Sequence, residues 1–354
     1  MLNNLTGLRF YAAMWVFLYH FFPVYTSAPK INIFEIGFLG VDVFFVLSGF
    51  ILTYVYFKKF FISKVTGRDY WNFIVKRFAK IYPLHFVITL IFIPLSCVGK
   101  YLFHQDSIHL YFNALLQNFL MIHSWSTTQY LSWNFPSWSI SAEWFAYLFL
   151  FVPLSFIYKF NKIFFLSFAG LVVCAFICYW VSIPDFTVDR YTMNGLPRII
   201  PEFIIGVLTG LIKIKFNLSK RKASLVCIFS LLFLFISFYF DFYFHQLCVI
   251  GFAVVILGLS YKTYFDGFFS SRQLIYLGNI SFAFYLTQFL SLIIYEQLFR
   301  ILFNLLESDY VLILQFSMAF SINFIFAALA YKYFEEPMRV LLVKKLTKSQ
   351  NRKA

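Results

Sequence analysis

The sequence has few charged residues and no polar stretch long enough to form a soluble domain. Only 12% of its 354 residues are charged, whereas about a quarter is usual in soluble domains. Hydrophobic residues make up 61% of the chain. A soluble fold of this composition could not cover its apolar surface with polar groups, so we expect one integral membrane domain.

Metal-ligand spacing is also missing from the cysteines. All five lie within or beside apolar runs, where a thiol behaves as a small hydrophobe. His104, His109 and His123 are the other conceivable metal cluster, but their loose spacing favours a solvated surface. We therefore predict neither a disulfide framework nor a metal site.

The basic residues form no patch, which argues against binding of nucleic acid. The net charge of +14 includes 29 Lys and Arg residues spread over short loops. Their distribution instead indicates topology, because 23 of the 29 fall on one side of the predicted membrane spans. By the positive-inside rule that side is cytosolic, and both termini should lie there.

Apolar runs between charged breaks predict an all-α, polytopic bundle of about ten transmembrane helices, several of which reach the roughly 20 residues needed to cross a bilayer. The spans lie near residues 8–27, 38–57, 81–99, 137–158, 163–181, 197–212, 223–241, 242–260, 276–300 and 310–331. Residues 108–125 are apolar but interrupted by polar side chains, which is typical of an interfacial or re-entrant helix. Residues 1–340 should form one transmembrane domain, followed by a basic cytosolic tail over 341–354 that can touch lipid.

Ionisable groups within apolar spans are the main functional signal, since each costs roughly 2.5 to 3.5 kcal/mol on insertion scales. They are Arg9 and His20 in the first span, Asp42 in the second, His85 in the third, Glu143 in the fourth, Glu202 in the sixth, and the 241–245 region after the seventh.

Arg9 and His20 lie eleven residues apart, which puts them within about 20° of one helix face but about 16 Å apart along the axis. One elongated molecule could contact both. A coenzyme thioester fits, because arginine suits its phosphates and histidine can take a hydroxyl proton at its acyl end. The alternative is that Arg9 anchors the cytosolic end of the span and His20 reaches the outer interface.

The segment from Trp138 to Glu143 combines hydroxyls with a carboxylate. Ser139 lies one helical turn before Glu143, so the two side chains can meet. Capping of the helix start explains the serine but not an acid one turn into the membrane. Glu143 could orient a histidine or accept a hydrogen bond from a sugar hydroxyl.

The second span contains one acid and one hydroxyl between glycines. Gly40, Ser48 and Gly49 fit close packing of helices. Asp42 needs a partner, for which Arg9 or a basic group of the donor are the candidates.

A basic cluster follows where the chain re-enters the membrane. Arg77, Lys80 and Tyr82 lie there, and such a cluster suits a phosphate-bearing donor. Many clusters of this kind are topology signals alone, and that alternative stays open.

Taken in chain order, these segments resemble the bacterial integral-membrane acyltransferase family 3, which modifies surface polysaccharides, lipid-linked glycans and some antibiotics. The matching segments are Leu5–Arg9 with Tyr19–Phe21, Gly40–Phe50, Arg77–Pro83, Trp138–Glu143, Ile280–Leu286 and Glu335–Arg339. The resemblance implies a ten-helix fold, acetyl-CoA as donor and an essential histidine at His20, with Arg9, Asp42, Arg77 and Glu143 at functional positions.

Two positions depart from the family pattern. Gln288 replaces a histidine found in many relatives, so it cannot supply a second base, and Trp144 replaces the second acid of a common Glu-Glu pair. The fused esterase-like domain of some members is not expected here. The resemblance to the stand-alone form implies O-acetylation of O-antigen, capsule or exopolysaccharide at the bacterial inner membrane.

We therefore expect a multi-pass O-acetyltransferase that moves an acetyl or other short acyl group from acetyl-CoA to a hydroxyl of a surface polysaccharide or lipid-linked glycan. The expected site residues are His20, Glu143 and Asp42 for catalysis, Arg9, Arg77, Lys80 and Tyr82 for the donor, and Ser48, Trp138 and Ser139 for the acceptor. His20 would deprotonate the hydroxyl or carry the acyl group itself, and both routes fit the sequence.

Two other classes of function remain. In a transporter or flippase of lipid-linked glycans the buried ionisable groups would relay protons, and inverted repeats, which we do not find, would favour it. A structural scaffold for envelope assembly would leave those groups unexplained.

Overall fold

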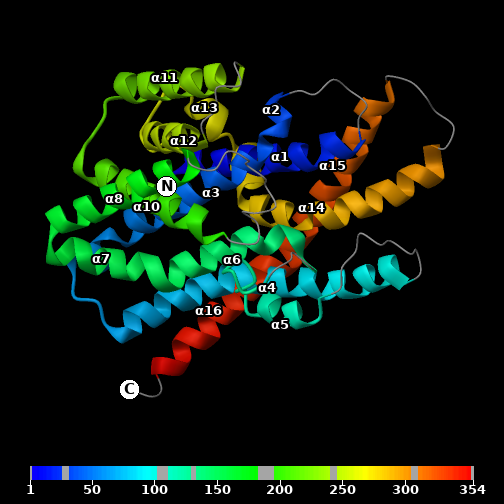
Figure 1. The fold of residues 1–354 in the computed structure, drawn as a ribbon, viewed down its shortest axis with the longest axis horizontal. Coiled ribbons are helices and arrows are strands. Elements are labelled where there is room, and N and C mark those ends of the chain that lie inside the picture. Colours follow the sequence, from blue (N-terminus) through cyan, green and yellow to red (C-terminus); the bar gives the residue numbers. More distant parts are fainter. Residues whose placement is uncertain are drawn as a thin grey trace.

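The computed structural model describes residues 2–25, 32–101, 111–128, 133–181, 195–239, 245–303 and 310–351. Within these ranges the regular structure is helical and no β-strand occurs (Figure 1). The predicted all-α fold is confirmed.

Each predicted span coincides with a helix in the described part of the chain. In chain order these are α1 (Asn3–Tyr25), α3 (Gly40–Tyr56), α4 (Gly67–Tyr101), α6 (Trp138–Phe145) continuing into α7 (Phe151–Phe160), α8 (Lys162–Val181), α10 (Leu196–Lys215), α11 (Lys220–Tyr239), α12 (His245–Leu259), α14 (Arg272–Phe303) and α15 (Tyr310–Ala330). Among the described residues, six stretches are long and apolar enough to cross a membrane, and α8 and α12 contain shorter apolar segments. The chain is a polytopic helix bundle, while the count of ten crossings stays a prediction.

Shorter elements connect or extend these helices. They are α2 (Asn32–Glu35), α5 (Asn113–Phe119), α13 (Asp266–Phe269), α16 (Glu336–Asn351), the 3-10 turns η1 (Gly37–Leu39) and η3 (Phe135–Ser137), and the π turns η2 (Phe57–Ile62), η4 (Ala146–Leu150) and η5 (Tyr331–Glu335). The π turns lie within or at the end of long helices, where such turns often mark functional positions.

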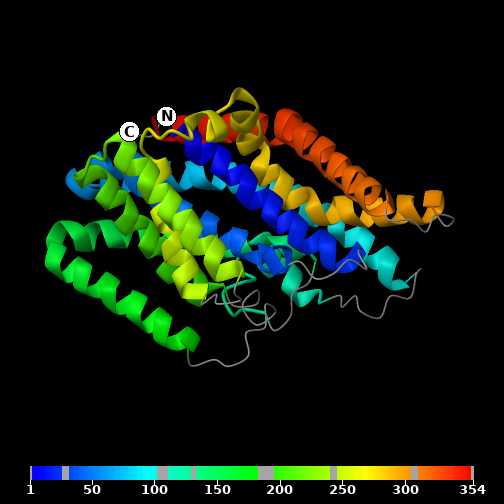
Figure 2. The same ribbon diagram turned by 90° about the horizontal axis from the view of Figure 1, so that it is seen from above.

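The beginning of α1 and helix α16 lie on the same side of the bundle, which we call the inner side (Figure 2). Helix α16 packs against α4 there. The described residues near the two ends of the chain thus lie on one side of the bundle, as the charge distribution predicts. That the inner side is cytosolic remains a prediction.

Helices α3 and α10 form the most extensive helix contact. Their backbones approach closely because glycines face each other, and a Cβ on Gly49 or Gly206 would overlap a carbonyl oxygen of the other helix. The glycine at position 49 therefore has the packing role expected of it.

The inner end of α1 is held by a second close approach. A Cβ on Gly7 would overlap the carbonyl oxygen of Phe269, and one on Gly278 would overlap that of Thr6. Helix α1 thus contacts α13 and α14 backbone to backbone, two residues before Arg9.

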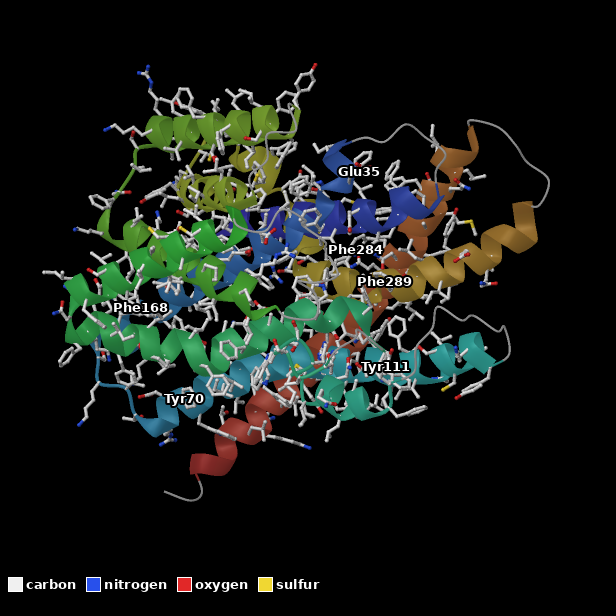
Figure 3. All side chains as sticks on the ribbon, viewed as in Figure 1. Glu35, Tyr70, Tyr111, Phe168, Phe284 and Phe289 are labelled. Carbon is white, nitrogen blue, oxygen red and sulfur yellow. The ribbon has the colours of Figure 1, made fainter. Side chains whose placement is uncertain are left out.

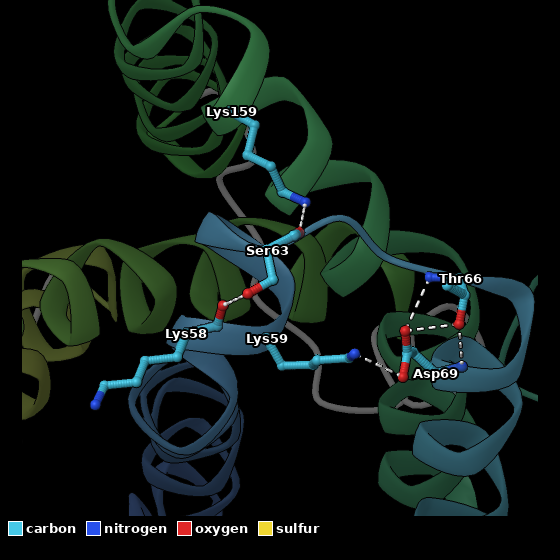
Figure 4. A network of polar contacts seen from close by, with 6 residues as sticks. All are labelled: Lys58, Lys59, Ser63, Thr66, Asp69 and Lys159. Atoms are coloured by element: carbon cyan, nitrogen blue, oxygen red, sulfur yellow. Dashed lines mark hydrogen bonds and ion pairs between the residues drawn. The ribbon is translucent and has the colours of Figure 1, made fainter.

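The loop between α3 and α4 is fixed by a capping box, in which the side chains at two ends of a helical turn bond each other's backbone (Figure 4). The backbone N–H of Thr66 donates to Asp69 Oδ2 at 2.9 Å, and the N–H of Asp69 donates to Thr66 Oγ1 at 3.3 Å. Lys59 Nζ lies 2.9 Å from Asp69 Oδ1, and Lys159 Nζ donates to the carbonyl of Ser63 at 2.6 Å. These contacts start α4 and so position the basic residues that follow.

The segment expected to be an interfacial or re-entrant helix is short, and its histidine is not solvated. Helix α5 covers seven residues of it. His123 is 3% exposed, its ring stacks 6.1 Å from that of His85, and Ser137 Oγ lies 3.1 Å from its Nε2. The predicted solvated surface is therefore wrong for His123, because α4 and η3 enclose it. His104 and His109 lie outside the described residues.

Candidate functional site

A cavity of about 190 Å³ lies inside the bundle between α1, α3, α4, α6 and α14. Apolar side chains form half of its wall. Its polar lining consists of Arg9, Ser48, Arg77, Lys80, Ser139, Glu143, Tyr147, Ser281 and Tyr285. Six of the ten residues expected at the site therefore meet here, although the sequence separates them by up to 134 positions.

Glu143 is held by two hydroxyl groups. Ser48 Oγ and Tyr147 OH both donate to its Oε1, and the two hydroxyl oxygens lie 2.9 Å apart. Within the described residues no hydrogen bond to Glu143 Oε2 is found. The carboxylate is thus oriented by one oxygen and can accept a hydrogen bond from a ligand with the other.

The contact that spacing allows between Ser139 and Glu143 is not formed. Ser139 Oγ instead lies 2.8 Å from the hydroxyl of Tyr285, which donates to the carbonyl of Pro136 at 2.8 Å. Tyr147 takes the place predicted for the serine, four residues after Glu143 rather than four before. Its position one turn away was the only signal in the sequence, and the π turn η4 that contains it was not predictable.

The basic side chains of the cavity differ in how they are neutralised. Lys80 forms an ion pair with Glu335 of η5, and its Nζ lies 5.4 Å from the centre of the Phe282 ring. The guanidinium of Arg77 lies 6.0 Å from the ring centre of Tyr147, and its Nε is buried without a hydrogen-bond partner among the described residues. No carboxylate of the described part lies within ion-pair distance of Arg9 or Arg77.

A second, wider cavity of about 640 Å³ adjoins the first on the inner side. The two cavities share Arg9, Arg77 and Lys80. The remaining lining comes from α4, α14, η5 and α16, namely Lys76, Asn279, Tyr331, Glu336, Arg339, Val340, Val343 and Lys344. Three shared cations therefore lie between a wide, basic cavity and a narrower one whose lining is half apolar.

His20 does not line either cavity. Its ring packs against Phe289, with ring centres 4.8 Å apart, and against Phe135 at 6.4 Å. Phe289, labelled in Figure 3, is half-buried on α14, one helical turn after the cavity residue Tyr285. The imidazole thus lies beyond the end of the narrow cavity, next to the two phenylalanines. Arg9, on the same helix, lines that cavity.

Gln288 precedes Phe289 on α14 and is fully buried. Neither polar atom of its amide has a hydrogen-bond partner among the described residues. The described part of the structure thus gives no hydrogen-bonding role to this departure from the family pattern.

Asp42 is paired with Arg198 rather than with Arg9, one of its two candidate partners. Arg198 Nε donates to Asp42 Oδ1 at 2.6 Å and its Nη2 donates to Oδ2 at 2.8 Å. The Trp138 ring lies 5.2 Å from the guanidinium, and Glu202 lies 3.7 Å from Arg198 Nε. All three charged side chains are at most 1% exposed. Asp42 and Trp138 line neither cavity, so they tie α3 to α10 and α6 instead.

Tyr82 is also absent from both cavity linings. Its ring stacks on Phe78, with centres 4.4 Å apart, and on Phe86 at 5.8 Å. Spacing of four residues puts these rings on one face of α4. Arg77 and Lys80 occupy another face, so the structure does not support the expected contact of Tyr82 with a donor.

The chemistry that these groups support is transfer between a polyanionic molecule and a hydroxyl compound. Unpaired cations can bind phosphate oxygens, an apolar wall can hold a short acyl chain, and a free carboxylate oxygen can orient a hydroxyl. Among the described residues no three His, Cys, Asp or Glu side chains are grouped to hold a metal ion.

Comparison with known proteins agrees with this chemistry. The family described as "Acyltransferase domain" matches residues 2–332. Acyltransferase MdmB of Streptomyces mycarofaciens is 35% identical over 156 residues, which are 42% of this chain and 38% of that relative. The alignment thus spans less than half of the relative's length. No solved structure matches the chain.

Proposed function

The chain belongs to the acyltransferase family whose domain matches residues 2–332, and on that premise we propose that it transfers an acetyl group from acetyl-CoA to a hydroxyl of a bacterial surface polysaccharide or lipid-linked glycan. The protein would act as a multi-pass protein of the inner membrane.

The observation that supports this proposal most is the pair of adjoining cavities. Acyl-CoA is polyanionic at its nucleotide end and uncharged at its acyl end. The wide cavity is lined by six Lys or Arg residues and one Glu, and the narrow one leads from the shared cations to Glu143. The negatively charged end of the donor therefore matches the wide, basic cavity at the inner side, and its uncharged acyl end matches the narrow cavity deeper in the bundle.

In the proposed reaction Arg9, Arg77 and Lys80 bind donor phosphates at the junction of the cavities. The acyl group lies in the apolar part of the narrow cavity. Glu143 Oε2 accepts a hydrogen bond from the acceptor hydroxyl, while Ser48 and Tyr147 fix the carboxylate from its other side.

His20 is the proposed base, because imidazole can take up a proton near neutral pH. The acceptor oxygen bonds to the acyl carbon, the carbon–sulfur bond breaks, and the proton held by His20 passes to the departing thiolate. The position of His20 beside Phe135 and Phe289 favours approach of the acceptor from the far end of the narrow cavity, opposite to the donor.

Asp42 leaves the proposed catalytic set. Both oxygens of its carboxylate accept hydrogen bonds from Arg198, so we assign it a positioning role at the contact between α3 and α10. Trp138 joins it there, whereas Ser139, at the cavity wall, stays a proposed acceptor contact.

The test compares surface glycans, by mass and by amount, between a strain lacking the gene and the same strain complemented with it. Loss of acyl groups from glycans that are otherwise complete and present in normal amount is expected. Unchanged acylation would overturn the proposal, and loss of the whole glycan from the surface would support the transporter instead. Membranes supplied with radiolabelled acetyl-CoA should label the glycan only when the protein is present.

A further inference from the structure

Helix α16 contributes charge to the wide cavity that the proposed reaction has not used. Arg339 and Lys344 line this cavity but not the narrow one. They come from the only lining element that follows the last predicted span, and α16 is held against α4. The outer wall of the cavity is therefore a basic helix face.

The protein cancels the positive charge of this wall only in part, through the ion pair between Glu336 and Arg339. Glu336 binds Arg339 through Nε, at 2.8 Å, and through Nη2, which leaves Nη1 without a partner in the described part of the chain. No carboxylate among the described residues lies within ion-pair distance of Lys76 or Lys344. Glu336 thus orients the guanidinium of Arg339, as Ser48 orients Glu143, and leaves the N–H groups of Nη1 available to a ligand in the wide cavity.

The cations fall into two sets at different depths. Arg9, Arg77 and Lys80 touch both cavities and form the inner set. Lys76, Arg339 and Lys344 touch only the wide one and form the outer set. Two separate sets fit a ligand with two separate phosphate groups better than one with a single group.

We propose that the outer set, led by Arg339 and Lys344 of α16, binds a phosphomonoester on the nucleotide end of the acyl donor, while the inner set binds its diphosphate. This inference rests on the proposed function. A phosphomonoester carries close to two negative charges at neutral pH and offers three acceptor oxygens, which suits an arginine fork with a lysine beside it. Helix α16 thereby favours CoA thioesters that carry this phosphomonoester over thioesters that lack it.

The experiment measures KM and kcat for acetyl-CoA and for acetyl-3′-dephospho-CoA with the full-length protein in neutral phosphatidylcholine vesicles. Wild type should show a KM about 10- to 100-fold higher for the dephosphorylated donor, the effect of losing a charge-assisted hydrogen bond. Arg339→Gln and Lys344→Gln should each raise the KM for acetyl-CoA by about tenfold or more. Neither should change the KM for the dephosphorylated donor further.

Lys345→Gln is the matched control, because Lys345 is exposed on the same helix and lines neither cavity. It should behave as wild type with both donors. Equal KM values of wild type for the two donors, or an equal rise for both donors in the variants, would overturn the inference and leave the proposed function standing. Transfer from neither thioester by wild type would overturn the proposed function itself.

An anionic lipid headgroup offers the same phosphate chemistry as the donor. The assay is therefore repeated in vesicles that contain phosphatidylglycerol. If the variants lose affinity only in those vesicles, the outer set binds lipid and the inference is wrong. A loss of equal size in both kinds of vesicle supports the donor.

Discussion

At the scale of single residues, the rate of transfer in the narrow cavity should depend on how the carboxylate of Glu143 is oriented. Glu143→Gln should lower kcat by about 10² to 10⁴, the range for loss of acid–base participation, because an amide keeps the shape of the side chain but not its charge. Tyr147→Phe removes one of two hydrogen bonds and should lower kcat by about tenfold with little change in donor KM. Tyr54→Phe, on an exposed ring outside the narrow cavity, is the control. A larger loss from Tyr147→Phe than from Glu143→Gln would contradict this order.

His20 provides a sharper test of the chemistry. His20→Gln keeps hydrogen bonding and volume but not basicity, so acyl transfer should fall by about 10² to 10⁴ while the protein stays inserted at normal abundance. Transfer is followed as labelled acetyl on the glycan, and abundance by immunoblot of membranes. If the variant acylates at a near-normal rate, His20 is not the base, and Glu143 in the narrow cavity becomes the candidate.

The buried ion pair between Asp42 and Arg198 makes an ordered prediction about stability. Removal of one partner of a buried pair costs about 3 to 5 kcal/mol, because the other charge is left without compensation. Arg198→Met should cost more than Asp42→Asn, since it leaves Asp42 and Glu202 buried without their shared cation, whereas the asparagine variant keeps Glu202 near the guanidinium. Thermal unfolding in detergent measures the difference. Equal losses, or the reverse order, would show that Glu202 does not share in the neutralisation of Arg198.

Residue types at the site were predictable, but their partners were not. The cost of burying a charge marks Arg9, Asp42 and Glu143 as functional candidates wherever they point. Partners such as Arg198 for Asp42, 156 positions away, follow from helix packing that no spacing rule contains. Arg198 lies at the edge of the predicted span 197–212 and is not among the ionisable groups that the sequence singles out.

At the scale of elements, the inner end of α1 is positioned by the close approach of backbones. Gly7→Ala or Gly278→Ala would place a methyl group against a carbonyl oxygen, so α1 must move and carry Arg9 with it. We expect donor KM to rise by about tenfold and thermal stability to fall. Gly170→Ala is the control, because nothing lies within 4 Å of a Cβ there and alanine favours a helix. Unchanged donor KM in the Gly7 and Gly278 variants would show that Arg9 does not depend on this contact.

Helices were the most predictable elements, because apolar length is a strong signal and each expected span has its helix. Their ends were less predictable. Helix α4 begins at Gly67, 14 residues before its predicted span at 81, since the capping box at Thr66 starts it in a polar stretch. The π turns have no signature in apolar periodicity, although two of them hold Tyr147 and Glu335 at the site.

At the scale of the whole molecule, the bundle has a basic inner side, and its orientation can be measured. Reporter fusions that distinguish cytosol from periplasm should read cytosolic at the C-terminus and in the loop between α3 and α4, because Lys and Arg are retained on that side. A periplasmic reading at the C-terminus alone would mean that the number of crossings is odd. Periplasmic readings at both places would mean that the bundle is inverted and that donor and acceptor sides must be exchanged.

The π turn η5 also sets which face of α16 the cavity meets. A π turn takes up one residue more than an α turn, so it shifts the angular phase of everything after it by about 100°. Deleting one residue of η5 would put Val340 where Arg339 now lies and Leu341 where Val340 lies, and would keep a lysine at the position of Lys344. The face of the helix, and with it the guanidinium of the cavity wall, is thus encoded by the length of a turn that precedes the helix rather than by the helix itself.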